Sequence, residues 1–230
     1  MKIENWREFA FFFILVGLIQ YLIFTTVAMF FYAGGTLVDS NTTGYSFWSN
    51  FFSDLGRTQA HSGKSNFTCY IIFVITGSVM AGSIIPFSIA FPHFFKDNNK
   101  ERQLSIIGSI FGIITAILML IVVILLPWDI YYYEHILVVM MYALTGLVSI
   151  ILFSIVMYLN SEYPNKYAYI LMTYTVLSLI YTFVLFFGPD MNTADGLMFQ
   201  ATKQKIMTYA FIITFFMQGY GALKFAKSLR

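Results

Sequence analysis

The chain has 230 residues, of which 59% are hydrophobic and only 10% are charged, and its formal net charge is +2. This composition is typical of a polytopic membrane protein and leaves no stretch long enough for a soluble domain. A charge so close to neutral also argues against nucleic acid as a partner, because binding to nucleic acid needs a strongly basic surface.

Six apolar segments are each long enough to cross the hydrocarbon core of a bilayer, which takes about 20 helical residues. The sequence therefore predicts an all-α fold, with six transmembrane helices in one bundle and residues 1–230 in a single domain. The first segment is too long for the core of a cleaved signal peptide, so we expect it to stay as a membrane anchor. The predicted spans are Phe9–Ala33, Phe67–Phe91, Leu104–Leu126, His135–Leu159, Tyr167–Gly188 and Lys205–Ala226.

Lysine and arginine are distributed unequally over the predicted loops. The two termini with the second and fourth loops carry nine of these residues, whereas the first, third and fifth loops carry four. Positively charged loops tend to stay in the cytoplasm. We therefore expect a protein of the cell membrane with both termini in the cytoplasm and with the first, third and fifth loops outside it.

A polar stretch with the sequence YSFWSNFFSDLGRT, residues 45–58, follows the first predicted span. Its large apolar residues recur at the spacing of one helix face, and Ser, Asn and Asp occupy the other face. Gly56 stands where a left-handed helix cap belongs. The pattern predicts a short amphipathic helix, Tyr45–Leu55, in the membrane interface, with its polar face toward the mouth of the bundle. The alternative is a re-entrant cap whose polar residues only satisfy helix ends.

Two features predict how the helices pack. Gly108, Gly112 and Ala116 form a stripe of small residues on the third span, which lets another helix come close. Gln20 and Gln218 lie at similar depths in the first and last spans, so we expect them to hydrogen-bond across the bundle.

The candidate site consists of polar residues on the three loops predicted to lie outside the cell. A charge near the hydrocarbon is costly unless it is paired, so we expect these residues to converge. The candidate acid–base residues are Asp54, Asp129 and His135, and the candidate ligand-binding residues are Ser49, Asn50, Ser53, Arg57 and Lys205.

Several alternatives remain open at these positions. Asp129 and His135 form either an acid–base pair or a plain interfacial hydrogen bond. Ser53 is a nucleophile only if His135 lies within hydrogen-bond reach. Lys203 is expected to extend to the headgroup level, whereas Lys205 must meet a carboxylate if it faces the bundle. His61 and His135 lack the i, i+4 spacing of a helical zinc motif, so no metal site is predicted, and the sequence does not determine a cofactor.

The segment FFSDLGRT, residues 51–58, the PWD sequence ahead of His135 and the QKI sequence at the sixth span resemble a known group of proteins. This group is the bacterial and archaeal six-span family of unknown function whose hallmark is a Ser-Asp-Leu-Gly segment after the first helix. The chain is more distantly similar to the Frag/DRAM/Sfk group, which carries a comparable Ser-Asp-x-Gly segment. The resemblance implies a six-helix topology, and the distant group implies a link to lipid handling and membrane regulation.

These features favour a membrane protein that binds, and could modify, a lipid headgroup in a polar pocket at the extracytoplasmic face. One alternative is a small-solute or ion transporter or channel, although the deep parts of the spans carry almost no ionisable residue. Another is a non-enzymatic membrane scaffold or assembly subunit. The sequence does not decide whether the protein is an enzyme, and it does not indicate a protein partner or a homo-oligomer.

Overall fold

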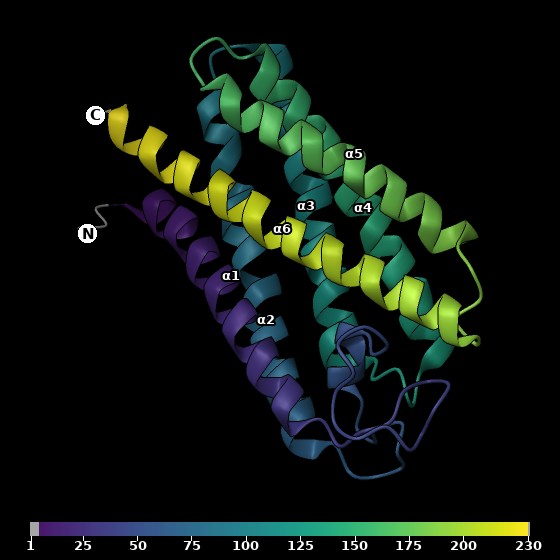
Figure 1. Cartoon of the computed structure of the whole chain (residues 1–230). Coiled ribbons are helices and arrows are strands. Elements are labelled where there is room, and N and C mark those ends of the chain that lie inside the picture. Colours follow the sequence, from purple (N-terminus) through teal and green to yellow (C-terminus); the bar gives the residue numbers. More distant parts are fainter. Residues whose placement is uncertain (1–4, 230) are drawn as a thin grey trace.

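The computed structural model describes residues 5–229 and contains six long helices in one bundle, as the sequence predicts (Figure 1). All six are long and apolar enough to cross a membrane, so the protein has the architecture of a multi-pass integral membrane protein. The helices are α1 (Trp6–Phe31), α2 (Phe67–Ala90), α3 (Asn99–Leu125), α4 (Tyr132–Leu159), α5 (Asn165–Phe187) and α6 (Ala194–Ser228), with two short 3-10 helices, η1 (Phe52–Gly56) and η2 (Phe91–Phe95).

The helices form a closed ring. Each helix packs against its neighbours in the chain, and α6 closes the ring by packing against α1 (Figure 1). The contact between α5 and α6 is the least extensive of the six. The helices therefore surround a common interior, which loop 1, residues 32–66, covers at one end. We call this end of the bundle the loop-1 end.

The last helix starts eleven residues before its predicted beginning. The side chain of Thr193 accepts a hydrogen bond from the backbone N–H of Gly196 and so caps the helix, which then runs for 35 residues. A helix of this length extends about 50 Å, well beyond a hydrocarbon core of about 30 Å. The first turns of the helix are polar, so a span defined by hydropathy alone does not include them. Lys203 and Lys205 therefore lie within the helix and not at its start.

The stripe of small residues on α3 packs as predicted. Gly108 accepts a hydrogen bond at 2.8 Å from the Oγ of Ser149 on α4. A Cβ added to Gly112 would lie 3.1 Å from the same Oγ and 2.7 Å from the Oγ of Ser88 on α2. Small side chains thus let α2, α3 and α4 approach closely at this level.

The predicted hydrogen bond between Gln20 and Gln218 is wrong. Gln20 donates to the backbone carbonyl of Thr76 on α2, and Gln218 donates to that of Tyr167 on α5. Each amide NH₂ group thus donates to a backbone carbonyl of the neighbouring helix on its own side of the ring.

The prediction of an amphipathic helix over Tyr45–Leu55 is also wrong. A turn closed by the carbonyl of Ser46 precedes η1, which begins only at Phe52. The side chain of Asn50 accepts from the backbone of Ser46, and that of Asp54 accepts from the backbone of Phe51. Such local side-chain bonds compete with the hydrogen bonds of a helix, which explains the broken conformation.

Gly56 does not adopt the predicted left-handed cap. The glycines with positive φ in residues 5–229 are Gly34, Gly35, Gly44 and Gly63. A glycine is required at position 56 for another reason, because a Cβ there would lie 2.7 Å from the ring of Phe73 on α2. Gly56 therefore lets loop 1 pack directly against the bundle.

Candidate functional site

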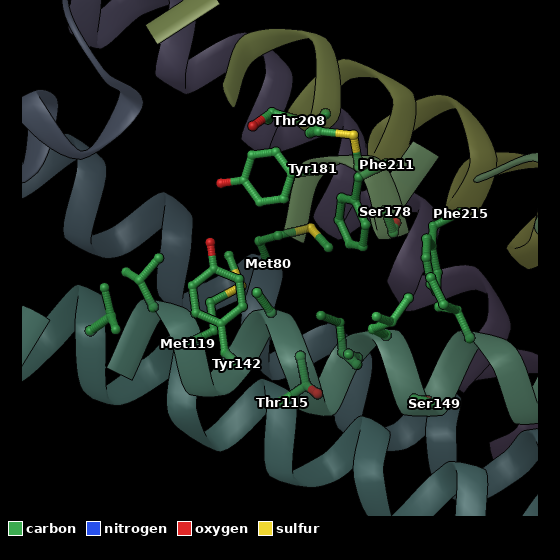
Figure 2. Close-up of a pocket in the computed structure, with 18 of the residues that line it drawn as sticks. Met80, Thr115, Met119, Tyr142, Ser149, Ser178, Tyr181, Thr208, Phe211 and Phe215 are labelled. Atoms are coloured by element: carbon green, nitrogen blue, oxygen red, sulfur yellow. The ribbon is translucent and has the colours of Figure 1, made fainter. Parts of the chain in front are cut away.

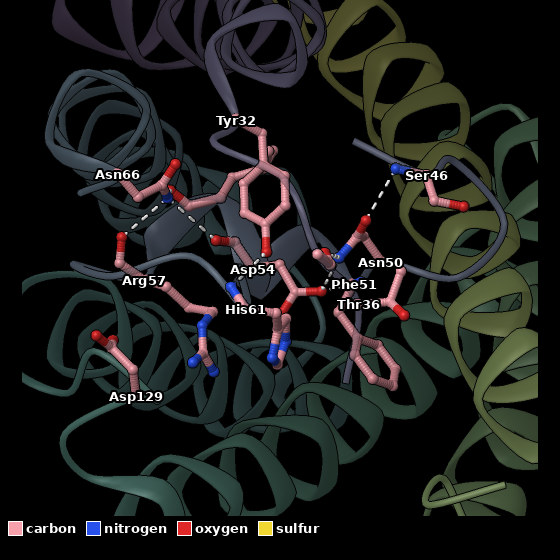
Figure 3. Close-up of polar contacts among 12 residues, drawn as sticks. Tyr32, Thr36, Ser46, Asn50, Phe51, Asp54, Arg57, His61, Asn66 and Asp129 are labelled. Carbon is pink, nitrogen blue, oxygen red and sulfur yellow. Dashed lines mark hydrogen bonds and ion pairs between the residues drawn. The ribbon is translucent and has the colours of Figure 1, made fainter. Parts of the chain in front are cut away.

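Asp54 is the centre of a buried hydrogen-bond network in loop 1 (Figure 3). Its side chain is 1% exposed. One carboxylate oxygen accepts from the side-chain amide of Asn50 at 2.9 Å and from the backbone N–H of Phe51 at 2.8 Å. The other oxygen lies 3.0 Å from Nε2 of His61. These three partners hold the carboxylate inside the loop and so brace the loop.

Two asparagines extend this network to the ends of loop 1 (Figure 3). The amide of Asn50 donates to the backbone carbonyl of Gly35 at 2.9 Å. Asn66, at the start of α2, donates to the carbonyl of Arg57 and accepts from the backbone N–H of Ala33. The polar residues of YSFWSNFFSDLGRT therefore fold loop 1 into a compact cover for the ring. This arrangement is close to the re-entrant cap that the sequence offered as the alternative to an amphipathic helix.

Asp129 joins the turn between α3 and α4 to loop 1. Its carboxylate accepts from the backbone N–H groups of Thr58 and Gln59 and from the hydroxyl of Thr58, at 2.6 to 3.1 Å. Partial burial raises the pKa of this carboxyl, but the hydrogen bonds from Thr58 and Gln59 outweigh burial and leave the pKa below its ordinary value of 3.8. The charged form of Asp129 is therefore favoured in the folded protein.

We expect Asp129→Asn to destabilise the protein in a pH-dependent way, on the order of 1 kcal/mol near neutral pH. Because the pKa is lower in the folded state, the ionised carboxylate stabilises the fold above pH 3.8, and this stabilisation is lost as the pH falls through the lower folded pKa. The difference in unfolding free energy between the wild type and Asp129→Asn should thus shrink below about pH 4. Unfolding in detergent at several pH values measures it. Asp97→Asn, which changes an exposed aspartate, is the control, and a gap that grows in acid would contradict this account.

Lys205 is buried under loop 1, with 2% of its surface exposed. Its Nζ donates to the backbone carbonyl of Asn50 and lies 5.2 Å from the ring centre of Phe47 and 5.5 Å from that of Tyr45. The expected ion pair with a carboxylate is not present among residues 5–229. Lys205 instead fixes loop 1 to α6, because a backbone carbonyl and aromatic faces also stabilise an ammonium group.

Asp129 and His135 bond to different partners and not to each other. Nδ1 of His135 lies 2.7 Å from the backbone carbonyl of Leu126, which can only accept, so Nδ1 carries a proton. In the neutral ring Nε2 is then an acceptor. Ser53 and His135 both line the cavities described below, although no hydrogen bond joins them within the described chain.

Arg57 and Ser49 lie outside these cavities. The Arg57 guanidinium lies 5.5 Å from the ring centre of Trp128, and its Nε donates to the carbonyl of Gln59. Ser49 bonds through its backbone to Ser46 in the turn before η1. Of the residues predicted to form the site, only Ser53 and His135 line either cavity, and the others hold loop 1 together.

Two adjoining cavities lie inside the helix ring next to loop 1. The first, which we call the central cavity, has a volume of about 230 Å³, and all six helices line it (Figure 2). The second, which we call the mouth cavity, has a volume of about 260 Å³ and lies at the loop-1 end between α4, α5 and α6. The two adjoin each other at five residues that line both, namely Ser53, His135, Val139, Tyr181 and Gln204.

The wall of these cavities changes from polar to apolar along α6. Gln200, Lys203 and Gln204 line the mouth cavity, and Phe211 and Phe215 line the central cavity. At 3.6 residues per turn these positions fall within an arc of about 120° and therefore share one face of the helix. Tyr174, Ser178 and Tyr181 follow one another at intervals of four and three residues on α5 and also line the central cavity. Figure 2 shows the ring of Tyr181 directed into this space.

Sequence reasoning missed the residues of α6 that line the mouth cavity. Gln204 lines both cavities, and its Oε1 accepts from the backbone N–H of Phe52 at 2.7 Å, so it also holds η1 in place. The signal was the spacing of Gln200, Gln204, Phe211 and Phe215 on one helix face. It went unused because α6 was predicted to begin at Lys205.

The structure brings together no set of metal ligands among the residues that it describes. No three His, Cys, Asp or Glu side chains group closely enough within residues 5–229 to hold a metal ion. Comparisons of the chain with protein-family models, with curated proteins and with solved structures found no match.

Proposed function

We propose that the protein binds a membrane lipid, with the polar head in the mouth cavity and an acyl chain in the central cavity. The observation that carries this proposal is the polar-to-apolar change along the α6 wall of two adjoining cavities. Ser53, His135 and Gln204 offer hydrogen-bonding groups where the cavities meet, and aromatic and methionine side chains line the space beyond. A ligand with a polar end and a long apolar end matches this arrangement.

The size of the central cavity supports an occupant. A water molecule needs about 10 to 15 Å³ of space measured in this way, so 230 Å³ would hold far more than one. An apolar wall with nothing packed against it loses dispersion contacts. An acyl chain would restore dispersion contacts with the wall.

The wall of the central cavity favours a lipid over a small ion. Within the described chain it includes no Asp, Glu, Lys or Arg side chain. Coupled transporters usually place such groups near the middle of the membrane, where they bind the ion or solute. We therefore favour lipid binding over transport.

The charge distribution supports a mouth cavity at the extracytoplasmic face. The basic residues are concentrated on the termini and on the loops at the opposite end of the bundle, which favours a cytoplasmic location for that end. At the loop-1 end Trp48 is 57% exposed and Tyr133 is 81% exposed, as suits aromatic residues at headgroup level. The ligand would then come from the outer leaflet of the cell membrane.

The proposal is tested by the thermal stability of delipidated protein in detergent. A ligand that binds only the folded state raises the unfolding temperature. We expect a dioleoyl phospholipid to raise it in a saturable way, whereas glycerophosphate, which has the head but no chains, should leave it unchanged. An equal rise with glycerophosphate would indicate a site for small solutes, and no rise with either compound would show that the cavities bind no such lipid. Both results would contradict the proposal.

A further inference from the structure

Two buried hydrogen-bond donors lack a protein acceptor in the wall of the mouth cavity. Nζ of Lys203 and Nε1 of Trp128 are both buried, and neither donates to any atom of residues 5–229. Trp128 as a whole is 4% exposed. Buried donors without a partner are rare in folded proteins, and a buried ammonium is the most costly of them. Both residues line the mouth cavity.

Lys203 contrasts with Lys205, two residues further along α6. The ammonium of Lys205 is bonded to a backbone carbonyl and surrounded by three aromatic rings. That of Lys203 has one aromatic neighbour, the ring of Tyr181, at 5.1 Å. The Nζ of Lys203 is nevertheless buried. Of these two lysines, Lys203 is the one whose ammonium still has capacity for a ligand.

The other groups around the mouth cavity do not neutralise Lys203. Asp190 also lines this cavity, but it is exposed and its Oδ1 accepts from the backbone and the side chain of Asn192. No ion pair joins Asp190 to Lys203 in the described part of the chain. Gln200 donates to the carbonyl of Pro189, so it too bonds within the protein.

We propose that the lipid bound here is a phospholipid and that its phosphate lies against Lys203 and Trp128 at the mouth cavity. This inference rests on the proposed function and adds the chemical class of the head. A phosphate diester is negatively charged, has several acceptor oxygens and donates no hydrogen bond, so it complements two donors of which one is a cation. A diacylglycerol has the same chains but no anionic group.

The test compares dioleoylphosphatidylglycerol with dioleoylglycerol on delipidated protein in detergent, using the lipid concentration needed for half of the maximal thermal stabilisation. We expect the wild type to bind the phospholipid about tenfold more tightly than the diacylglycerol, as charge-assisted hydrogen bonds suggest. Lys203→Met should bring the two lipids to within about twofold of each other, because the acyl-chain cavity is unchanged while the charged contact is lost. Lys203→Arg should retain most of the preference. Lys227→Met, which changes an exposed lysine near the C-terminus, should behave like the wild type.

The outcomes separate this inference from the proposed function. If the wild type binds both lipids equally, or if Lys203→Met keeps the wild-type preference, the phosphate assignment is wrong and lipid binding still stands. If the wild type binds neither lipid, the proposed function itself fails. A third arm uses inorganic phosphate. Protection of the wild type by inorganic phosphate alone, lost in Lys203→Met, would assign the site to free phosphate and overturn the lipid assignment.

Discussion

Replacing Asp54 by alanine is expected to destabilise the protein by about 3 to 5 kcal/mol. The change removes the acceptor for the amide of Asn50, for the backbone N–H of Phe51 and for His61. Asn50 and Asp54 are almost completely buried, so the donors left behind cannot turn to water. The loss should spread through loop 1, because the same network positions the carbonyl of Asn50 that holds Lys205.

A graded pair of variants distinguishes this network from a general effect of mutation. Asp54→Asn should be much milder than Asp54→Ala, because an amide oxygen can still accept from Asn50 and Phe51 while its NH₂ group donates to a neutral His61. Asp97→Ala, at an exposed position, is the control. Denaturant unfolding in mixed micelles gives the free energies. If Asp54→Ala unfolds at the same point as Asp97→Ala, the network does not brace loop 1.

The helical architecture was predictable because hydrophobic burial in a membrane has a simple signature. Each span is a long apolar run, and its backbone must satisfy its own hydrogen bonds within the hydrocarbon. A close helix contact at Gly108 was predictable for a similar reason, because only small residues let helices approach so closely, although the sequence did not identify α4 as the partner. Both features depend on neighbouring residues in the sequence.

The conformation of loop 1 was not predictable from the same patterns. Its apolar spacing matched a helix, yet the side chains of Asn50 and Asp54 bond to nearby backbone groups and prevent one. The partners of Asp54 also include His61, which no periodicity connects to it. Tertiary hydrogen bonds of this kind decide the structure of a polar segment, and hydrophobic spacing does not report them.

The two lysines of α6 show why the site was predicted only in part. Residues two apart on a helix lie about 200° apart around its axis, so Lys203 and Lys205 face different surroundings. The sequence left open whether Lys205 faces the bundle and did not show which side of α6 loop 1 covers. In the structure loop 1 covers Lys205, whereas Lys203 lines the mouth cavity. His135 lies in the first turn of α4, and its place in the cavity wall depends on how the helices pack around that space.

We expect the second large effect, a loss of lipid binding, from a substitution that fills the central cavity with a larger side chain. Ala143 on α4 lines this cavity, so the indole of Ala143→Trp should occupy the space proposed for the acyl chain. Filling an existing cavity costs little when the new side chain meets no backbone, so the variant should stay folded while lipid binding falls at least tenfold. Val176→Trp is the matched control, because Val176 is 56% exposed on the outer surface of α5. Lipid stabilisation of the two purified variants, measured as for the wild type, tests this difference.

The central claim is that an acyl chain lies inside the helix ring, and photolabelling with a phospholipid that carries a diazirine near the end of its chain tests it most directly. Phe211 and Phe215 line the central cavity, whereas Ile213 is 63% exposed on another face of α6. We expect mass spectrometry to find label on Phe211 and Phe215 in the wild type and to find this label lost in Ala143→Trp, with label on Ile213 in both proteins. Label confined to Ile213 and other outward-facing residues of the wild type would contradict the account, because the lipid would then touch only the outside of the bundle.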